Sequence, residues 1–247
     1  MDRVVWESWH MFVYYDDESI EHLRNLENEY YAKINSEEPI VVYIKDSGLP
    51  KLDTKLKLDR YRIGIFHEHY YELLIFLEII NTIFNYVDIN ELNIIFKGLF
   101  RLCSAISKSE IKDINTLRNL IIESIDMYKD GYLEYMATGK TDFYNKVPIP
   151  FVMMDNLIPL IKESIGLKKH FSLMIEFDGD ISIYSCKAIN DYVASRCTGY
   201  LSMNILLHDD SEWKSWYSNN GQFVERVHDY SVVDLRKQKI KCKNGQK

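Results

Sequence analysis

The densest cluster of candidate metal ligands begins at His67. His67, Glu68 and His69 are consecutive, and Glu72 follows three residues after His69. On a helix, His69 and Glu72 share one face whereas His67 does not, so that face leaves a tetrahedral metal half coordinated. The H-E-x-x-H spacing of zinc hydrolases is absent. We therefore predict an amphipathic helix start here, with a metal site at His67, His69 and Glu72 as the alternative.

A second candidate lies in the C-terminal third, where acidic residues surround a predicted turn. Gly179 stands between Asp178 and Asp180, and alternating apolar runs lie on either side, Phe171–Asp178 and Ile181–Ser185. An acid followed by glycine between two such runs predicts a β-hairpin.

The order of residue types along this segment, acids in the hairpin and then a lysine, resembles the core motif of the PD-(D/E)xK nucleases. Ser185 stands where that family has its second acid, two residues before Lys187. The resemblance implies a divalent cation held by Asp178, Asp180 and a substitute carboxylate such as Glu176. It also implies that Lys187 orients the attacking water. An acidic turn followed by a Ser-capped helix is the alternative interpretation.

A third group combines aromatic rings with acids near the C-terminus. Its rings and its acids are Trp213, Trp216, Tyr217, Asp209, Asp210 and Glu212. Exposed rings beside charged residues are typical of protein interfaces, where a few rings dominate the binding energy. We expect this group to bind a protein partner, with a packed corner of the core as the alternative.

Other catalytic signatures are incomplete in this sequence. There is no G-x-S-x-G, and the four cysteines are far apart without a C-x-x-C pair, which favours reduced thiols in the cytoplasm. Gly139-Lys140-Thr141 ends like a phosphate-binding loop, but no glycine-rich run precedes it. The sequence therefore favours a protein that is not an enzyme, and we expect no cofactor.

Charge is distributed unevenly along the 247 residues. The chain is 47% hydrophobic and 27% charged, with a formal net charge of −7. The last 12 residues hold six basic and no acidic groups, so residues 1–235 carry 24 basic against 37 acidic residues, a formal charge of −13. Because phosphate neutralisation supplies most of the affinity for nucleic acids, this body is not expected to bind them stably. Many Ile and Asn residues against few Ala indicate an AT-rich bacterial or viral genome.

The N-terminal two thirds divide into a mixed part and a helical part. Residues 1–66 read as β-α-β-β, with strands in 4–15, 40–45 and 55–66 and a helix over 20–34. Residues 67–137 predict three long helices, the second begun by a capping box of Asp88 and Glu91 and the third by Asn115. The apolar run 73–87 is too short and too polar to span a membrane, so it predicts a buried core helix.

The remainder predicts a second mixed region. After a connecting loop over 138–150, residues 151–236 alternate helix and strand, with the hairpin at 171–185 and strands at 200–207, 223–227 and 230–235, and residues 237–247 form a disordered basic tail. The expected fold class is α+β in one compact domain.

Two functions are compatible with this sequence. We expect an acidic binding protein that blocks the basic surface of a partner, as immunity proteins, antitoxins or phage counter-defence proteins do. The alternative is a divalent-metal-dependent nuclease or hydrolase with a degenerate motif.

Overall fold

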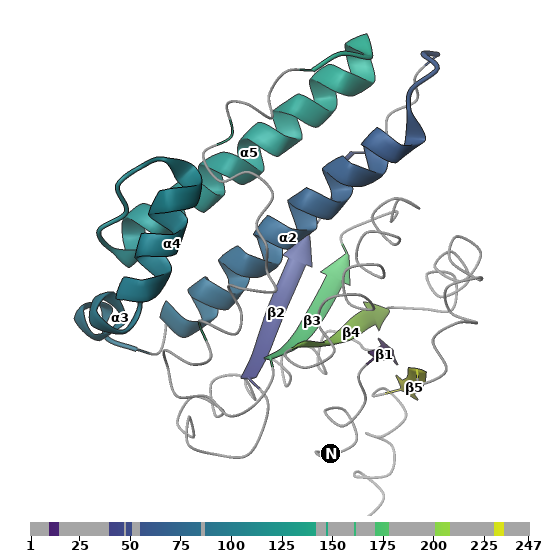
Figure 1. Ribbon diagram of the computed structural model, residues 1–247. Coiled ribbons are helices and arrows are strands. Elements are labelled where there is room, and N and C mark those ends of the chain that lie inside the picture. The colour runs from purple at the N-terminus through teal and green to yellow at the C-terminus, as the bar shows by residue number, and fades with distance from the viewer. Residues whose placement is uncertain are drawn as a thin grey trace, which may run out of the picture. The chain divides into compact units, whose positions relative to one another are not determined.

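A computed structural model describes residues 10–14, 40–46, 48–50, 55–84, 87–141, 147, 161, 171–177, 201–207 and 230–234 (Figure 1). The chain divides into two compact units. The sheet unit comprises Met1–Gly48, Lys169–Cys186 and Val193–Lys247, and the helical unit comprises Leu49–Lys168 and Lys187–Tyr192. The prediction of a single domain stays a prediction.

The sheet unit contains a five-stranded parallel sheet. Its strands are β1 (His10–Tyr14), β2 (Ile40–Asp46), β3 (Phe171–Phe177), β4 (Leu201–Leu207) and β5 (Tyr230–Asp234). They are ordered β2-β3-β4-β1-β5, and every pairing is parallel. The N-terminal and C-terminal mixed regions of the sequence therefore contribute to one sheet.

Strand β3 is buried on both faces. Successive side chains of a strand point to opposite faces, and four consecutive residues of β3, from Leu173 to Glu176, are all buried. Strands covered on both faces are typical of parallel sheets, and their sequences are runs of apolar residues.

The predicted hairpin is not formed by β3. This strand pairs with β2 along one edge and with β4 along the other, both in parallel. A strand has only two edges, so β3 cannot also pair with Ile181–Ser185. The acid-glycine turn signal was wrong because it does not distinguish a hairpin from the end of a buried parallel strand. Residues 181–185 lie outside the described part of the chain.

The helical unit contains four described helices, α2 (Arg60–Phe84), α3 (Ile89–Ile95), α4 (Lys97–Ser107) and α5 (Ile114–Thr138). Within the described residues, helices together with parallel strands agree with the expected α+β class in its coarse form. The predicted helix N-caps are partly confirmed. Asp88 caps α3 by accepting from the backbone N–H groups of Asn90 and Glu91, and Asp113, rather than Asn115, caps α5.

Three boundaries differ from the sequence prediction. Residues 60–66, predicted as strand, form the first two turns of α2, because a helix buries Ile63 and Phe66 on one face and leaves Tyr61 exposed. The second predicted helix is broken at Phe96, which separates α3 from α4. Gly139 adopts a left-handed conformation (φ 72°) at the C-terminal cap of α5, so the Gly139-Lys140-Thr141 match is a helix end and not a phosphate-binding loop.

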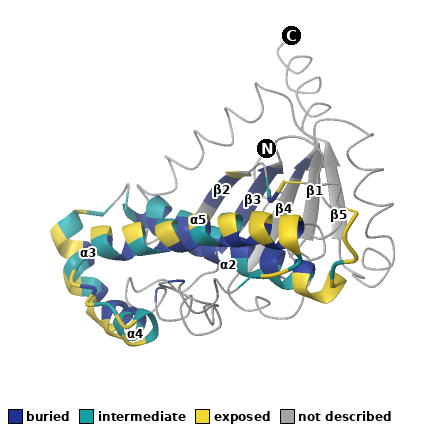
Figure 2. Ribbon diagram, turned by 90° about the horizontal axis from the view of Figure 1, so that it is seen from above, coloured by how far each residue is buried: buried dark blue, intermediate teal, exposed yellow. Residues whose placement is uncertain are grey.

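The core of the helical unit lies between α2 and α5. These helices are antiparallel, since the start of α2 contacts the end of α5 through Phe66 and Tyr135, and the end of α2 contacts the start of α5 through Asn81 and Arg118. Figure 2 shows α2 largely buried and α5 exposed along one side. The run from Leu73 to Ile83 is mostly buried, as predicted. Among the described residues, no helix is long and apolar enough to cross a membrane.

Candidate functional site

The five strands of the sheet unit end at the same level. Parallel strands bring all their carboxyl ends to one edge of the sheet. The register pairs at this edge run across the sheet as Asp46–Phe177, Glu176–Leu206, Tyr14–Leu207 and Tyr14–Asp234.

The carboxyl edge contains a topological switch point between β1 and β4. From β1 the chain continues to β2 at one edge of the sheet, whereas from β4 it continues past β1 to β5 at the other edge. Neighbouring strands whose onward connections run in opposite directions mark the place where open α/β sheets bind ligands.

Each of the five strands has an aspartate at its last residue or within the next two residues of the sequence. Asp46 and Asp234 are the last residues of β2 and β5. Asp178 directly follows β3, while Asp16 and Asp209 follow β1 and β4 after one further residue. Asp16, Asp178 and Asp209 lie outside the described residues.

The charge of the two units differs strongly. Leaving out the last 12 residues, the sheet unit holds 8 basic and 20 acidic residues, a formal charge of −12. The helical unit holds 16 basic and 17 acidic residues, a formal charge of −1. Nearly all the acidic excess therefore belongs to the sequence of the sheet unit.

An ion pair joins β2 to β3 one residue before the strand ends. Lys45 and Glu176 are register partners, and Lys45 Nζ lies 2.9 Å from Glu176 Oε1. The side chain of Glu176 is 8% exposed and that of Lys45 is 48% exposed. A buried carboxylate is unfavourable without a cation or hydrogen-bond donors, so Lys45 compensates the buried charge. The Glu176 Oε2 atom accepts no hydrogen bond within the described residues.

Among the residues of the nuclease resemblance, the structure describes only Glu176, and the ion pair with Lys45 explains why this carboxylate is there. Glu176 lies on a strand with parallel neighbours and is bonded to Lys45, not placed on a hairpin beside a second acid. Asp178, Asp180 and Lys187 lie outside the described residues. The hairpin on which the PD-(D/E)xK resemblance depends is absent at β3.

The predicted metal cluster lies within α2, well after its first turn. Because α2 begins at Arg60, His67, His69 and Glu72 are not at the helix start, and the first turn contains no acidic residue. The interpretation as an amphipathic helix start was therefore wrong. His67 and Glu72 are fully buried and His69 is half-buried. Within the described residues, no group of three or more His, Cys, Asp or Glu side chains is arranged to hold a metal ion.

The histidines instead belong to a seam of aromatic rings between α2 and α5. His67 packs edge-on against Tyr132 with the ring centroids 5.3 Å apart, and burial lowers the pKa of His67 to about 3. The Nδ1 atom of His69 lies 3.1 Å from the hydroxyl of Tyr128. Phe66 contacts both Tyr132 and Tyr135. At neutral pH His67 is uncharged and serves the packing of this seam.

At the other end of α2 and α5, polar side chains of the two helices form a hydrogen-bonded network. Arg118 Nε donates to Asn81 Oδ1 at 2.6 Å, and the amide of Asn81 donates to Glu78. Burial raises the pKa of Glu78, while Asn81 and Arg118 act in the opposite direction. These contacts satisfy polar groups within the unit.

The predicted partner-binding group, Trp213, Trp216, Tyr217, Asp209, Asp210 and Glu212, lies outside the described residues, as do residues 237–247. Its position in the chain is nevertheless informative, because the group directly follows the carboxyl end of β4 at the switch point.

Two features escaped the sequence prediction. Lys45, the partner of Glu176, gave no signal of its own, because a lysine at the end of a strand can keep its ammonium group in water. The other is the tyrosine row of α5. Tyr128, Tyr132 and Tyr135 recur at helical spacing, which places them on one face.

Comparison with known proteins finds no match: neither a family model, nor a curated protein, nor a solved structure is similar to this chain.

Proposed function

We propose that the sheet unit binds a cationic protein partner through the carboxylates at its carboxyl edge. The observation that carries this proposal is the parallel sheet whose strands end at one level, each with an aspartate at its last residue or within the next two residues of the sequence. An acidic protein of this kind inhibits its partner by occupying a basic surface, as immunity proteins, antitoxins and phage counter-defence proteins do. Such a protein acts in the cytoplasm with its cysteines reduced.

The width of the edge favours a protein partner over a single ion. Neighbouring strands lie about 4.8 Å apart, so five strand ends span about 19 Å. A cation coordinates ligands within about 2.6 Å, whereas a basic protein surface presents several separated charges. Asp209 and Asp210 follow β4 at the switch point, and Trp213, Trp216 and Tyr217 come next in the chain. In our proposal these rings supply the anchors of the interface.

The test compares two variants that remove the same charge. Asp209→Asn/Asp210→Asn alters the carboxyl edge, and Asp126→Asn/Asp130→Asn removes two exposed carboxylates from α5. Affinity capture from host extract, quantified by mass spectrometry, identifies proteins that bind the wild type and the α5 variant but not the edge variant. We expect a protein of basic pI in that set. Equal capture by all three forms, or equal loss in both variants, contradicts the proposal.

A metal-dependent hydrolase is the second candidate. Adjacent strands β3 and β4 end together, and Asp178 and Asp209 follow them. Carboxylates from neighbouring strand ends suit Mg²⁺ or Mn²⁺ as ligands. The protein is incubated with single- and double-stranded DNA and RNA in each metal. Cleavage abolished by Asp178→Asn and by Asp209→Asn, with Asp126→Asn/Asp130→Asn as the control, favours the hydrolase over the binding protein.

A further inference from the structure

One end of the helical unit carries a compact cationic surface. The backbone N–H of Asp59 donates to the hydroxyl of Tyr135 at 3.0 Å, and the guanidinium of Arg62 lies 5.6 Å from the centre of the Tyr135 ring. A Cβ on Gly139 would lie 3.6 Å from Leu58 Cδ2. The start of α2 and the end of α5 therefore form one surface, which we call the basic tip.

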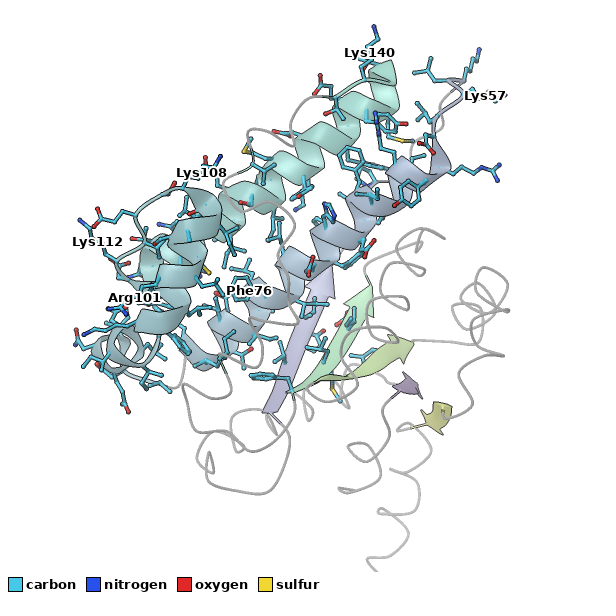
Figure 3. The ribbon with its side chains drawn as sticks, in the orientation of Figure 1. Lys57, Phe76, Arg101, Lys108, Lys112 and Lys140 are labelled. Atoms are coloured by element: carbon cyan, nitrogen blue, oxygen red, sulfur yellow. The ribbon has the colours of Figure 1, made fainter. Side chains whose placement is uncertain are left out.

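Five exposed cations define the basic tip, namely Lys55, Lys57, Arg60, Arg62 and Lys140. Figure 3 shows Lys57 and Lys140 at this end of the unit, with Arg101, Lys108 and Lys112 at the other end. No carboxylate of the described residues forms an ion pair with any of the five.

Among the described residues, two acids of this end, Asp59 and Glu134, accept local hydrogen bonds. The carboxylate of Asp59 accepts from the backbone N–H of Tyr61 at 2.9 Å, and that of Glu134 accepts from the hydroxyl of Thr141 at 3.4 Å. Counting these two acids, the tip carries a formal charge of +3 within a unit of −1. The basic tip is therefore positively charged, although the whole chain has a negative net charge.

An exposed aromatic ring lies among these cations. Tyr61 is 77% exposed, the highest value among the large hydrophobic residues that the structure describes. It stands between Arg60 and Arg62 on the first turn of α2, while Leu56 and Leu133 are 44% and 40% exposed. Charged residues separate the ring from these leucines in the sequence. A ring surrounded by cations is how proteins bind single-stranded nucleic acids, with bases stacked on the ring and phosphates paired to the cations.

We propose that the basic tip binds single-stranded nucleic acid, with the five cations on phosphates and the ring of Tyr61 stacked on a base. The proposal is independent of the function proposed for the sheet unit, since it concerns other residues and the opposite charge. It differs from the expectation, based on net charge, that the body does not bind nucleic acid stably.

The charge part is tested by fluorescence anisotropy on the full chain, with a labelled oligothymidylate of about 12 nucleotides. Each phosphate contact on a single strand contributes about −0.7 to the slope of log K against log salt. Lys55→Gln/Lys57→Gln should weaken binding at least fivefold in low salt and make the slope shallower by about 1.4. Lys97→Gln/Arg101→Gln, which removes two exposed cations from α4, should change neither. The basic tail is present in every form, so its contribution cancels.

The stacking part is tested at Tyr61 under the same conditions. Tyr61→Phe keeps an aromatic ring and should bind like the wild type, whereas Tyr61→Leu should bind about fivefold or more weakly, since base stacking is lost. Thermal melting by circular dichroism verifies that each variant is folded. Anisotropy that stays at the free value for the wild type, equal loss in both double variants, or wild-type binding by Tyr61→Leu overturns the proposal. So does a tip-dependent affinity for vesicles of anionic phospholipid without affinity for the oligonucleotide.

Discussion

The sheet unit and the helical unit place their polar groups in opposite ways. Among the described residues of the helical unit, four polar side chains are buried, His67, Glu72, Thr82 and Ser124, while its charge is nearly balanced. The described core of the sheet unit is apolar except for Glu176, while its sequence carries a formal charge of −12. The helical unit thus buries polar groups in its core, whereas two acids of the sheet unit, Asp46 and Asp234, are the last residues of their strands. This difference is the reason to assign partner binding to the sheet unit.

The largest expected effect concerns the aromatic seam. Phe66 is fully buried and packs against Tyr132 and Tyr135. Phe66→Ala removes a core ring and should destabilise the helical unit by about 3–5 kcal/mol. Hydrogen exchange of peptides from α2 and α5 measures this loss. Tyr61→Ala, on the same helix but exposed, should change stability by no more than about 0.5 kcal/mol. Equal effects of the two substitutions would contradict the statement that the aromatic rings between α2 and α5 form the core of this unit.

The next effect concerns His67 and pH. Burial lowers the pKa of His67 to about 3 in the folded protein, against about 6.5 in the unfolded chain. Between these values only the unfolded chain binds the proton, so stability decreases as pH falls from 6.5 towards 3, by about 1.4 kcal/mol per unit.

The measurement is urea denaturation at pH 7.5 and pH 5. The wild type should lose about 2 kcal/mol more than His67→Gln between these two pH values, because the variant has no imidazole to protonate. The same pH dependence in both proteins would show that the imidazole is accessible to protons in the folded state.

The ion pair of the sheet unit gives a smaller effect. Lys45→Met leaves Glu176 buried without its cation and should cost about 1–2 kcal/mol, reduced from the value for a fully buried pair because Lys45 is half-exposed. Lys45→Met/Glu176→Leu removes both charges and should restore most of that loss. A double-mutant cycle by chemical denaturation measures the coupling. Additive losses would mean that the two charges do not stabilise each other.

The smallest effect is at a helix cap. Asp113 accepts from the backbone N–H of Thr116 at 2.7 Å and from its hydroxyl at 3.0 Å. Asp113→Ala should destabilise the helical unit by about 1 kcal/mol, whereas Asp113→Asn retains an acceptor and should cost less. Thermal denaturation of both variants compares them. An unchanged melting temperature for Asp113→Ala would show that this cap does not stabilise α5.

These elements differ in how far the sequence predicts them. The strands at 40–46, 201–207 and 230–234 and the long helices were predictable, because apolar runs and helical spacing are local signals. The start of α2 and the break at Phe96 depend on tertiary packing and not on a local signal. Strand order was not predictable, since β1 pairs with β4 and β5 across some 190 residues or more.

The candidate site likewise combines residues that local sequence signals indicate with pairings that only the tertiary structure shows. The sequence indicated Asp178 as an acid at a predicted turn and Asp209 and Asp210 as acids beside aromatic rings, but only the parallel order places the ends of β3 and β4 side by side. Lys45 and Glu176 are 131 residues apart in the chain, so their pairing requires the register of β2 and β3.

In the proposed function, carboxylates at the strand ends attract a cationic partner. Electrostatic attraction acts mainly on the association rate and is screened by salt. The most direct measurement is therefore the association rate of the captured partner from low to physiological salt, for the wild type, Asp209→Asn/Asp210→Asn and Asp126→Asn/Asp130→Asn. We expect an association rate that falls about tenfold or more with salt for the wild type and the α5 variant, and a clearly weaker salt dependence for the edge variant. The dissociation rate should change little. An association rate independent of salt, or the same dependence in both variants, would contradict the proposed function.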